Sequence, residues 1–266
     1  MSDSTKVDRK PSFAELYEEF IVPTMSGPWA PKVVAAADIL PGDKVLDIGC
    51  GTGVLSREAA ERVNSENQIS GIDINPEMLS VARRLRPNID WHQGDAAKLP
   101  FDTGSFDVVV SQFVLMFVPD KIAALKEMWR VMTGGGRLSV AVWWRSSGYP
   151  ILADIARRRI NDEVADAFLA PFCFDNAAAL QKLFLSAGIE NPKIQSLEGW
   201  GNFSSIDEFV RIEIKGWVEG QLEGGMSNED YNAFLKDARE KLAPYRAANG
   251  EAHIPMDVHL VAAQKS

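Results

Sequence analysis

The stretch VLDIGCGTG, residues 45–53, places three glycines within five positions directly after four residues typical of a buried strand. VLSREAAERV, residues 54–63, follows with apolar side chains on one helical face. A strand, a glycine turn and a helix in this order predict the first unit of a parallel sheet. Ligands bind such sheets at the carboxyl ends of the strands, and glycines let a ligand touch the backbone there.

The same alternation of strands and helices continues along most of the chain. Further strands are expected over residues 68–73, 89–95, 106–113, 137–144, 193–199 and 257–264, with the first strand over 44–49 and a turn at 134–136. Residues 106–113, FDVVVSQF, are apolar nearly throughout, as expected for a strand covered by helices on both faces. The fold class predicted is α/β, a doubly wound and mostly parallel seven-stranded sheet of the Rossmann-like kind with helical cap insertions.

The pattern predicts three regions. Residues 1–40 form an N-terminal helical lid, whose first helix covers 13–22 and ends at Pro23. Residues 41–145 form the α/β core that binds the ligand. Residues 146–266 complete the sheet with strands six and seven and carry helical cap insertions at 146–173 and 204–246.

Composition narrows the classes of partner. The 28 basic and 37 acidic side chains leave a net charge of −9 and a pI of about 5.0, which disfavours a nucleic-acid substrate. Cys50 and Cys173 are the two cysteines, and no cluster of metal ligands is visible. The first twelve residues lack a signal-peptide core, and the longest apolar stretch, 11 residues, is too short to span a membrane. We therefore expect a cytoplasmic protein without bound metal.

Three aspartates follow the expected strands at the ligand-binding edge. Asp47 precedes the glycine loop, Asp73 ends the second strand and Asp95 ends the third. Their roles as loop or helix-cap residues are the alternative. The loop spacing is G-x-G-x-G, with Val54 where a dinucleotide fingerprint has glycine. A carboxylate at Asp47 would repel a pyrophosphate but would suit a ligand with an ammonium group.

The ordered motifs VLDIGCGTG, GIDINPEML, GDAAKLPFDTGSFDVVVSQ and LKEMWRVMTGGGRLSV resemble class I S-adenosylmethionine-dependent methyltransferases. The resemblance covers roughly residues 40–145 and is nearest to the ubiquinone/menaquinone-type small-molecule enzymes. It implies S-adenosyl-L-methionine as cofactor, S-adenosyl-L-homocysteine as product, and a small-molecule acceptor methylated at O, N, S or C. A monomer or homodimer is expected.

The resemblance also implies roles for individual residues. Asp47 would support the amino group of the cofactor, Asp73 the ribose, and Asp95 the adenine edge. The complete set of expected cofactor-binding residues is Tyr17, Trp29, Asp47, Gly49, Cys50, Gly51, Gly53, Asp73, Ile74, Met78, Gly94, Asp95, Ala96 and Gln112. Tyr17 and Trp29 would close over the cofactor, with ordinary helix packing as the alternative.

The acceptor pocket is expected between the cap and the strand ends. Its candidates, each with core packing as the alternative, are Phe113, Met116, Trp143, Trp144, Tyr149, Phe172, Trp200, Phe203 and Trp217. No convincing base is found, and His253 in a loop before Pro255 is the weak candidate. Some quinone C-methyltransferases carry histidines just after strand four, whereas this chain has SQFVLMFVPD, residues 111–120. Thr133 replaces the usual proline before the paired glycines.

Two further functions remain open. A nicotinamide-dependent oxidoreductase would use a similar sheet, but the glycine spacing, Asp47 and Asp95 oppose it. A protein that binds the cofactor without transferring methyl groups is the other alternative, and the missing base favours it.

Overall fold

The computed structural model describes residues 11–218 and 225–266, with the side chains of 217 and 218 excepted. The strands are β1 (Val45–Ile48), β2 (Ile69–Asp73), β3 (Asp90–Gln93), β4 (Phe106–Gln112), β5 (Met132–Ser146), β6 (Lys193–Leu197), β7 (Trp200–Phe203) and β8 (Ala252–Gln264). They form one sheet in the order β3-β2-β1-β4-β5-β8-β6, and β7 pairs with β8 outside that path. The mixed α/β fold is as predicted, but the sheet has eight strands, not seven.

The first five strands are parallel to one another, and β8 is antiparallel to all three of its partners, β5, β6 and β7. In the sheet, β2 and then β3 are added on one side of β1, and β4 is then added on the other side of β1. The sheet therefore has its topological switch between β1 and β4, which is where α/β sheets open a crevice for ligands.

The core helices are α2 (Ala30–Ala36), α3 (Val54–Val63), α4 (Pro76–Leu85), α5 (Lys121–Val131) and α8 (Ala177–Ser186). Because right-handed crossovers leave β1 and β4 in opposite directions, α3 and α5 cover opposite faces of the sheet. Strands β1 and β4 are accordingly buried along almost their whole length, as their apolar sequences predict.

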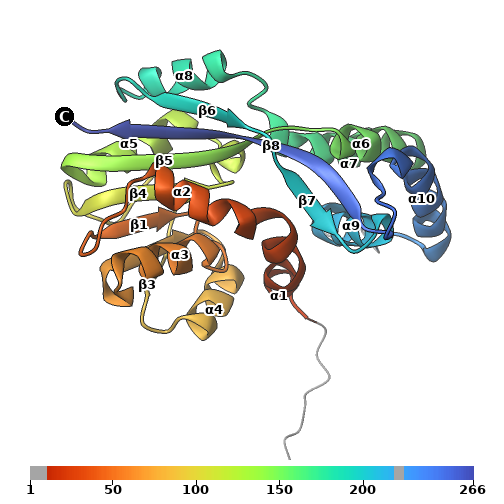
Figure 1. Cartoon of the computed structure of the whole chain (residues 1–266), viewed down its shortest axis with the longest axis horizontal. Helices are drawn as coiled ribbons and strands as arrows, with labels where there is room; N and C mark the ends of the chain where they lie inside the picture. The colour runs from red at the N-terminus through yellow and green to blue at the C-terminus, as the bar shows by residue number, and fades with distance from the viewer. Residues whose placement is uncertain (1–10, 219–224) are drawn as a thin grey trace, which may run out of the picture.

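Four cap helices gather at one end of the molecule, beyond the carboxyl ends of the parallel strands (Figure 1). They are α6 (Gly148–Arg159), α7 (Asp162–Leu169), α9 (Ile206–Glu213) and α10 (Asn228–Lys241). Figure 1 shows β8 running from this end back along the sheet. Its first residues pair with β7, a strand that sequence reasoning missed because residues 200–203 continue directly from β6 after a two-residue break.

The N-terminal helix does not end at Pro23 as predicted. Helix α1 (Phe13–Leu16) continues as the π-helical segment η1 (Tyr17–Ser26), then η2 (Gly27–Trp29), and joins α2. Proline removes one backbone donor and its ring collides with the carbonyl four residues earlier in an α-helix. The wider π-helical turn relieves that collision, and the Thr24 hydroxyl donates to the carbonyl of Phe20.

Two strands begin earlier than predicted. Strand β5 begins at Met132, because Met132 pairs with Phe106 of β4. The glycines at 134–136, expected to form a turn, lie within β5, where the register between the two strands shifts between Phe106 and Val108. Strand β8 begins at Ala252 because it pairs with β7 as well as with the core. The described residues contain no helix with the length and apolar character needed to cross a membrane. The division into lid, core and cap stays a prediction.

Candidate active site

The glycine loop between β1 and α3 turns back toward β2. The amides of Gly49 and Cys50 donate to the carbonyl of Ile72 at 2.7 and 3.0 Å, and the Gly51 amide donates to Asp73 Oδ2 at 2.8 Å. The other oxygen of Asp73 accepts from the Asn75 amide at 2.8 Å. One aspartate at the end of β2 therefore fixes both the glycine loop and the start of α4.

Two loop glycines hold conformations that other residues rarely adopt. Gly49 and Gly51 have φ angles of 68° and 55°. A Cβ at Gly49 would lie 2.3 Å from Val114 Cγ2, whereas a Cβ at Gly51 would meet no atom within 4 Å. Gly49 is therefore required for packing, and Gly51 presents bare backbone to open space.

Asp47 lies beneath this loop and is buried. Its Oδ2 accepts from the Ser56 hydroxyl at 2.6 Å. Desolvation raises the pKa of Asp47 to about 7, opposed by the Ser56 hydrogen bond and reinforced by the charge of Asp73. Desolvation also raises the pKa of Asp73. Ionising both Asp47 and Asp73 is costly in this buried setting, and a positively charged group bound nearby would lower that cost.

A cavity of about 220 Å³ opens beside the loop at the carboxyl ends of the first strands. Its lining is Ile48, Gly49, Ile72, Asp73, Ile74, Gly94, Asp95, Ala96, Val114, Phe117, Val118 and Pro119. Ile74 is 68% exposed although it is apolar, so its side chain offers a hydrophobic face to a ligand. Asp95 Oδ1 accepts from the Ala97 amide at 2.8 Å, which shapes the turn after β3.

A second cavity, of about 380 Å³, lies between the N-terminal segment, the sheet edge and the cap. Its lining is Phe13, Tyr17, Ile21, Met25, Ser26, Met78, Phe113, Phe117, Trp143, Tyr149, Pro171, Phe172, Glu213 and Gly216. Phe117, in the short helix η4 (Leu115–Phe117), lines both cavities. We call the first the polar cavity, after Asp73 and Asp95 in its lining, and the second the aromatic cavity. The two are neighbours that share one wall.

The aromatic cavity is built on a stacked pair. The rings of Phe113 and Trp143 lie 3.7 Å apart and within 5° of parallel. Phe113 has a φ of 58°, an uncommon conformation for a bulky residue, and its amide donates to the carbonyl of Ala141 at 2.8 Å. The sharp turn at the end of β4 therefore places this ring on Trp143, and strained backbone of this kind is often found at functional sites.

The N-terminal segment is tied to the core near both cavities. Gln112 Nε2 donates to the carbonyl of Ser26 at 2.9 Å, and Gln112 Oε1 is buried without a partner among the described residues. Arg57 donates from Nη1 to the carbonyl of Thr52 and from Nη2 to Glu18, at 2.8 and 2.7 Å. These bonds hold the segment across the carboxyl edge of the sheet.

The predicted cofactor residues mostly meet at this edge. Gly49, Asp73, Ile74, Gly94, Asp95 and Ala96 line the polar cavity, while Tyr17 and Met78 line the aromatic one. Asp47, Cys50, Gly51 and Gly53 form the adjoining strand end and loop. Trp29 lines neither cavity; its buried ring packs edge-on against Trp143, with ring centroids 6.5 Å apart.

The predicted acceptor-pocket residues divide into two groups. Phe113, Trp143, Tyr149 and Phe172 line the aromatic cavity. The others do not: Met116 and Phe203 are buried in the core, Trp144 stacks on His259, Trp200 is 54% exposed, and the side chain of Trp217 lies outside the described residues. The sequence alone could not separate these groups, since aromatic residues occur both in cavity walls and in the core.

His253 lies in β8 rather than in a loop. Its Nδ1 is 2.7 Å from Asn202 Oδ1, and it lines neither cavity. Sequence reasoning missed Phe13, Ile21, Phe117 and Glu213. Of these, Glu213 carries a usable signal, because it follows Ile206, Phe209 and Val210 at helical spacing, where an apolar residue is expected.

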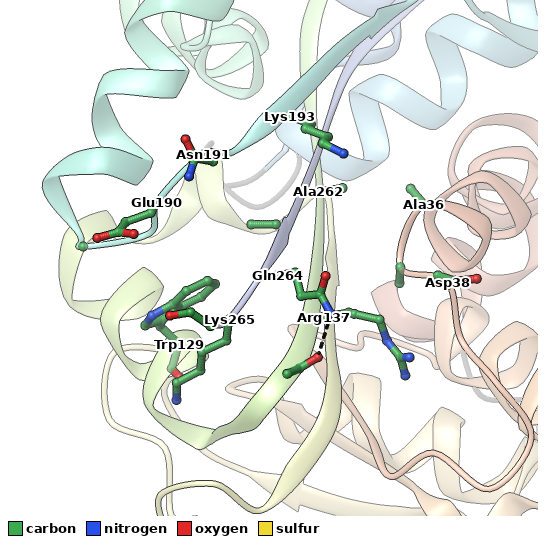
Figure 2. A pocket seen from close by; sticks show the side chains of 15 residues that line it. Ala36, Asp38, Trp129, Arg137, Glu190, Asn191, Lys193, Ala262, Gln264 and Lys265 are labelled. Carbon is green, nitrogen blue, oxygen red and sulfur yellow. Dashed lines mark hydrogen bonds between the residues drawn. The ribbon is translucent and has the colours of Figure 1, made fainter.

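A larger cavity, of about 850 Å³, is far from these residues. It is a groove at the opposite edge of the sheet, where β5 starts and β8 ends (Figure 2). Arg137, Lys193 and Lys265 lie around it among mixed polar and apolar neighbours. None of the residues predicted to bind the cofactor or the acceptor lines this groove.

A family model described as a methyltransferase domain matches residues 45–136, the segment from β1 to the start of β5. By this match, residues 45–136 are a methyltransferase domain. The glycine loop and all the lining residues of the polar cavity lie within this matched segment.

Two curated relatives are similar to this part of the chain. A demethylmenaquinone methyltransferase of Staphylococcus epidermidis is 40% identical over 111 residues, which cover 41% of this chain and 46% of that protein. The ubiquinone/menaquinone biosynthesis C-methyltransferase UbiE of Stenotrophomonas maltophilia is 36% identical over 159 residues, 53% of this chain and 63% of its own length. The match thus spans about half to three-fifths of these relatives.

A solved structure extends the likeness of fold beyond the matched segment. The YcgJ protein of Bacillus subtilis is 17% identical, has a TM-score of 0.60, and covers 89% of this chain and 97% of its own. At this identity the likeness concerns the fold alone, and the residues of the cap have to be judged by their own geometry.

Proposed function

We propose that the protein transfers a methyl group from S-adenosyl-L-methionine to a small apolar acceptor and releases S-adenosyl-L-homocysteine. The observation that carries the proposal is the shared wall at Phe117. A cavity that joins bare backbone and aspartates adjoins a larger cavity lined by aromatic rings. The first suits a nucleoside with an amino-acid tail, and the second suits an apolar molecule.

The residues present fit this cofactor. The open space at Gly51 admits the amino-acid part, and Asp47 beneath it favours the ammonium group. Asp73 keeps acceptor capacity for the ribose hydroxyls, since a carboxylate oxygen accepts more than one hydrogen bond. Ile74 offers an apolar face to the adenine, and Asp95 an acceptor to its amino group. Gly49, Gly53, Gly94 and Ala96 shape the backbone around these positions.

The reaction mainly requires that the nucleophile of the acceptor, the methyl group and the sulfur lie in line. When bound, S-adenosyl-L-methionine supplies a methyl group that its positively charged sulfur has already activated for displacement. The stacked rings of Phe113 and Trp143 and the N-terminal segment orient the acceptor and exclude water. Orientation of this kind contributes up to about 7–11 kcal/mol in well-aligned reactions. The described lining of both cavities contains no histidine. A base is needed only for an acceptor that arrives protonated.

An aromatic or quinone-like acceptor fits the lining. The curated relatives are named for quinone methylation. The segment after β4 lacks the histidines expected of quinone C-methyltransferases, and most residues that line the aromatic cavity belong to the N-terminal segment and the cap, outside the matched segment. We therefore infer the general class, a planar apolar small molecule. The cytoplasmic location, the monomeric or homodimeric state and the absence of a nucleic-acid partner stay predictions.

Calorimetric titration distinguishes the proposal from an oxidoreductase. We expect S-adenosyl-L-homocysteine to bind the purified protein and NADH to show no comparable binding. Tight NADH binding without binding of the thioether would overturn the proposal. Incubation of the loaded protein with a bacterial metabolite extract should then release S-adenosyl-L-homocysteine. Binding without any release would favour a protein that holds the cofactor without transferring methyl groups.

A further inference from the structure

One polar pair interrupts the apolar wall of the aromatic cavity. Tyr149, at the start of α6, donates its hydroxyl hydrogen to Glu213 Oε1 at 2.8 Å. Glu213 is the last residue of α9, so the bond joins two cap helices. The two residues are 2% and 1% exposed, and both line the cavity.

The pair has a definite hydrogen-bonding character. Because the Tyr149 hydroxyl uses its hydrogen in the bond to the Glu213 carboxylate, the oxygens of both groups can act only as acceptors toward a further molecule. Desolvation, followed by the charge of Glu213, raises the pKa of Tyr149 well above its ordinary value, so the hydroxyl stays protonated. The position is also rigid. The Tyr149 ring lies against Phe172 and Phe209, with ring centroids 4.8 and 5.8 Å away.

A purely structural role explains this pair poorly. Burial of a carboxylate is costly, and apolar residues of similar size usually support helix packing at least as well. Glu213 follows Ile206, Phe209 and Val210 on the buried face of α9, where leucine would extend the apolar face. A charged residue at such a position in a cavity wall indicates that the cavity receives something polar.

We infer that the Tyr149–Glu213 pair receives the hydrogen-bond donor of the methyl acceptor. The acceptor class is then a planar apolar molecule that carries a hydroxyl or a protonated amine, with its apolar body against Phe113, Trp143 and Phe172. This inference rests on the proposed function, because that function makes the aromatic cavity the acceptor site. A carboxylate acceptor strengthens a hydrogen bond to either donor, and more so to a cation.

Matched probe pairs test the inference on the whole chain. The first pair is 2-naphthol and 2-methylnaphthalene, and the second is 2-phenylethylamine and propylbenzene. Binding is followed by the change in tryptophan fluorescence, with S-adenosyl-L-homocysteine present and absent. We expect one donor-bearing probe to bind at least tenfold more tightly than its hydrocarbon partner. The pair that shows the preference identifies the donor as hydroxyl or ammonium.

Three variants assign that preference to the pair. Glu213→Gln keeps the side-chain volume and should reduce the preference at least fivefold, while the hydrocarbon binds within twofold of wild type. Tyr149→Phe should reduce it at least threefold and decides the matter if Glu213→Gln fails to fold. Glu19→Gln, which removes an exposed charge outside the cavity, should leave the preference unchanged.

Two results would overturn the inference. One is the absence of any preference for a donor-bearing probe in the wild-type protein. The other is an unchanged preference in a folded Glu213→Gln or Tyr149→Phe variant. The affinity for S-adenosyl-L-homocysteine, measured on the same samples, separates the two claims. Loss of that affinity in the wild type would defeat the proposed function, whereas a lost preference with cofactor binding intact would defeat only this inference.

Discussion

The Gly51 amide donates to the Asp73 carboxylate at 2.8 Å, across 22 positions of sequence. The bond joins the loop after β1 to the end of β2 and holds bare backbone at the edge of the polar cavity. Both residues act at the same edge of the sheet. Asp73 accepts hydrogen bonds through its carboxylate, and Gly51 leaves open space because it has no side chain. Each therefore supports a separate prediction.

Asp73→Ala should weaken binding of S-adenosyl-L-homocysteine more than tenfold, or more than about 1.4 kcal/mol. The variant loses the acceptor for the ribose and the bond that positions Gly51. Titration calorimetry measures the effect. Asp90→Ala, which removes an exposed aspartate at the other end of neighbouring β3, serves as the control and should bind normally. Unchanged affinity in a folded Asp73→Ala protein would show that the ligand lies elsewhere.

Gly51→Val should also weaken binding more than tenfold. Its side chain would occupy the open space that the ligand needs, and its φ of 55° would be strained. Gly135→Val is the matched control, because Gly135 also has a positive φ, of 78°, and a Cβ there also meets no atom within 4 Å, but it lies far from the loop. Thermal melts should show both variants folded. Equal affinity of the two variants would contradict the placement of the ligand over Gly51.

Cofactor affinity should depend on pH through Asp47. Its pKa is raised to about 7 in the free protein, so folding favours its protonated form and stability falls as pH rises from about 4 toward 7. A bound ammonium group favours the ionised form, so affinity for S-adenosyl-L-homocysteine should rise up to tenfold per pH unit below 7 and then level. Titrations at pH 6 in buffers of different ionisation enthalpy should detect proton release.

Asp47→Asn provides the control for this pH dependence. The variant should bind more weakly at pH 8 and lose the rise in affinity between pH 5.5 and 7. The same steep rise in Asp47→Asn would assign the proton to another group, of which Asp73 is the nearest candidate because its pKa is raised too.

Arg57→Gln should loosen the N-terminal segment. Arg57 joins the glycine loop to Glu18, and both side chains are largely buried. We expect three- to tenfold weaker cofactor binding and faster hydrogen exchange over residues 16–25. Arg84→Gln removes an exposed partner of the same segment, through Glu15, and should change neither quantity by more than twofold. Equal effects of both variants would indicate general destabilisation of the N-terminus.

The core of the fold could be predicted because its signals are local. The glycines at 49, 51 and 53, with aspartates at the strand ends, place the polar cavity by the topology of a parallel sheet alone. The aromatic cavity depends on contacts between residues far apart in the chain. Phe13, Phe117 and Glu213 come from three separate elements, and no periodic pattern in the sequence predicts that they line the same cavity.

Two predictions from local sequence, at Pro23 and at His253, were wrong because the surrounding structure overrides the local preference. Pro23 predicts a helix end, but a π-helical turn accommodates it and Thr24 satisfies a carbonyl. Pro255 predicts a loop around His253, but both residues lie in β8 because β7 supplies a pairing partner. Tertiary pairing of this kind overrides local propensity and could not be read from the sequence.

A crystal structure with S-adenosyl-L-homocysteine tests the central claim most directly. The account predicts density along the carboxyl edge of β1, β2 and β3, with the ribose within hydrogen-bonding distance of Asp73 and the sulfur facing the aromatic cavity. A vacant edge, or the ligand seated in the groove around Arg137 and Lys265, would contradict it.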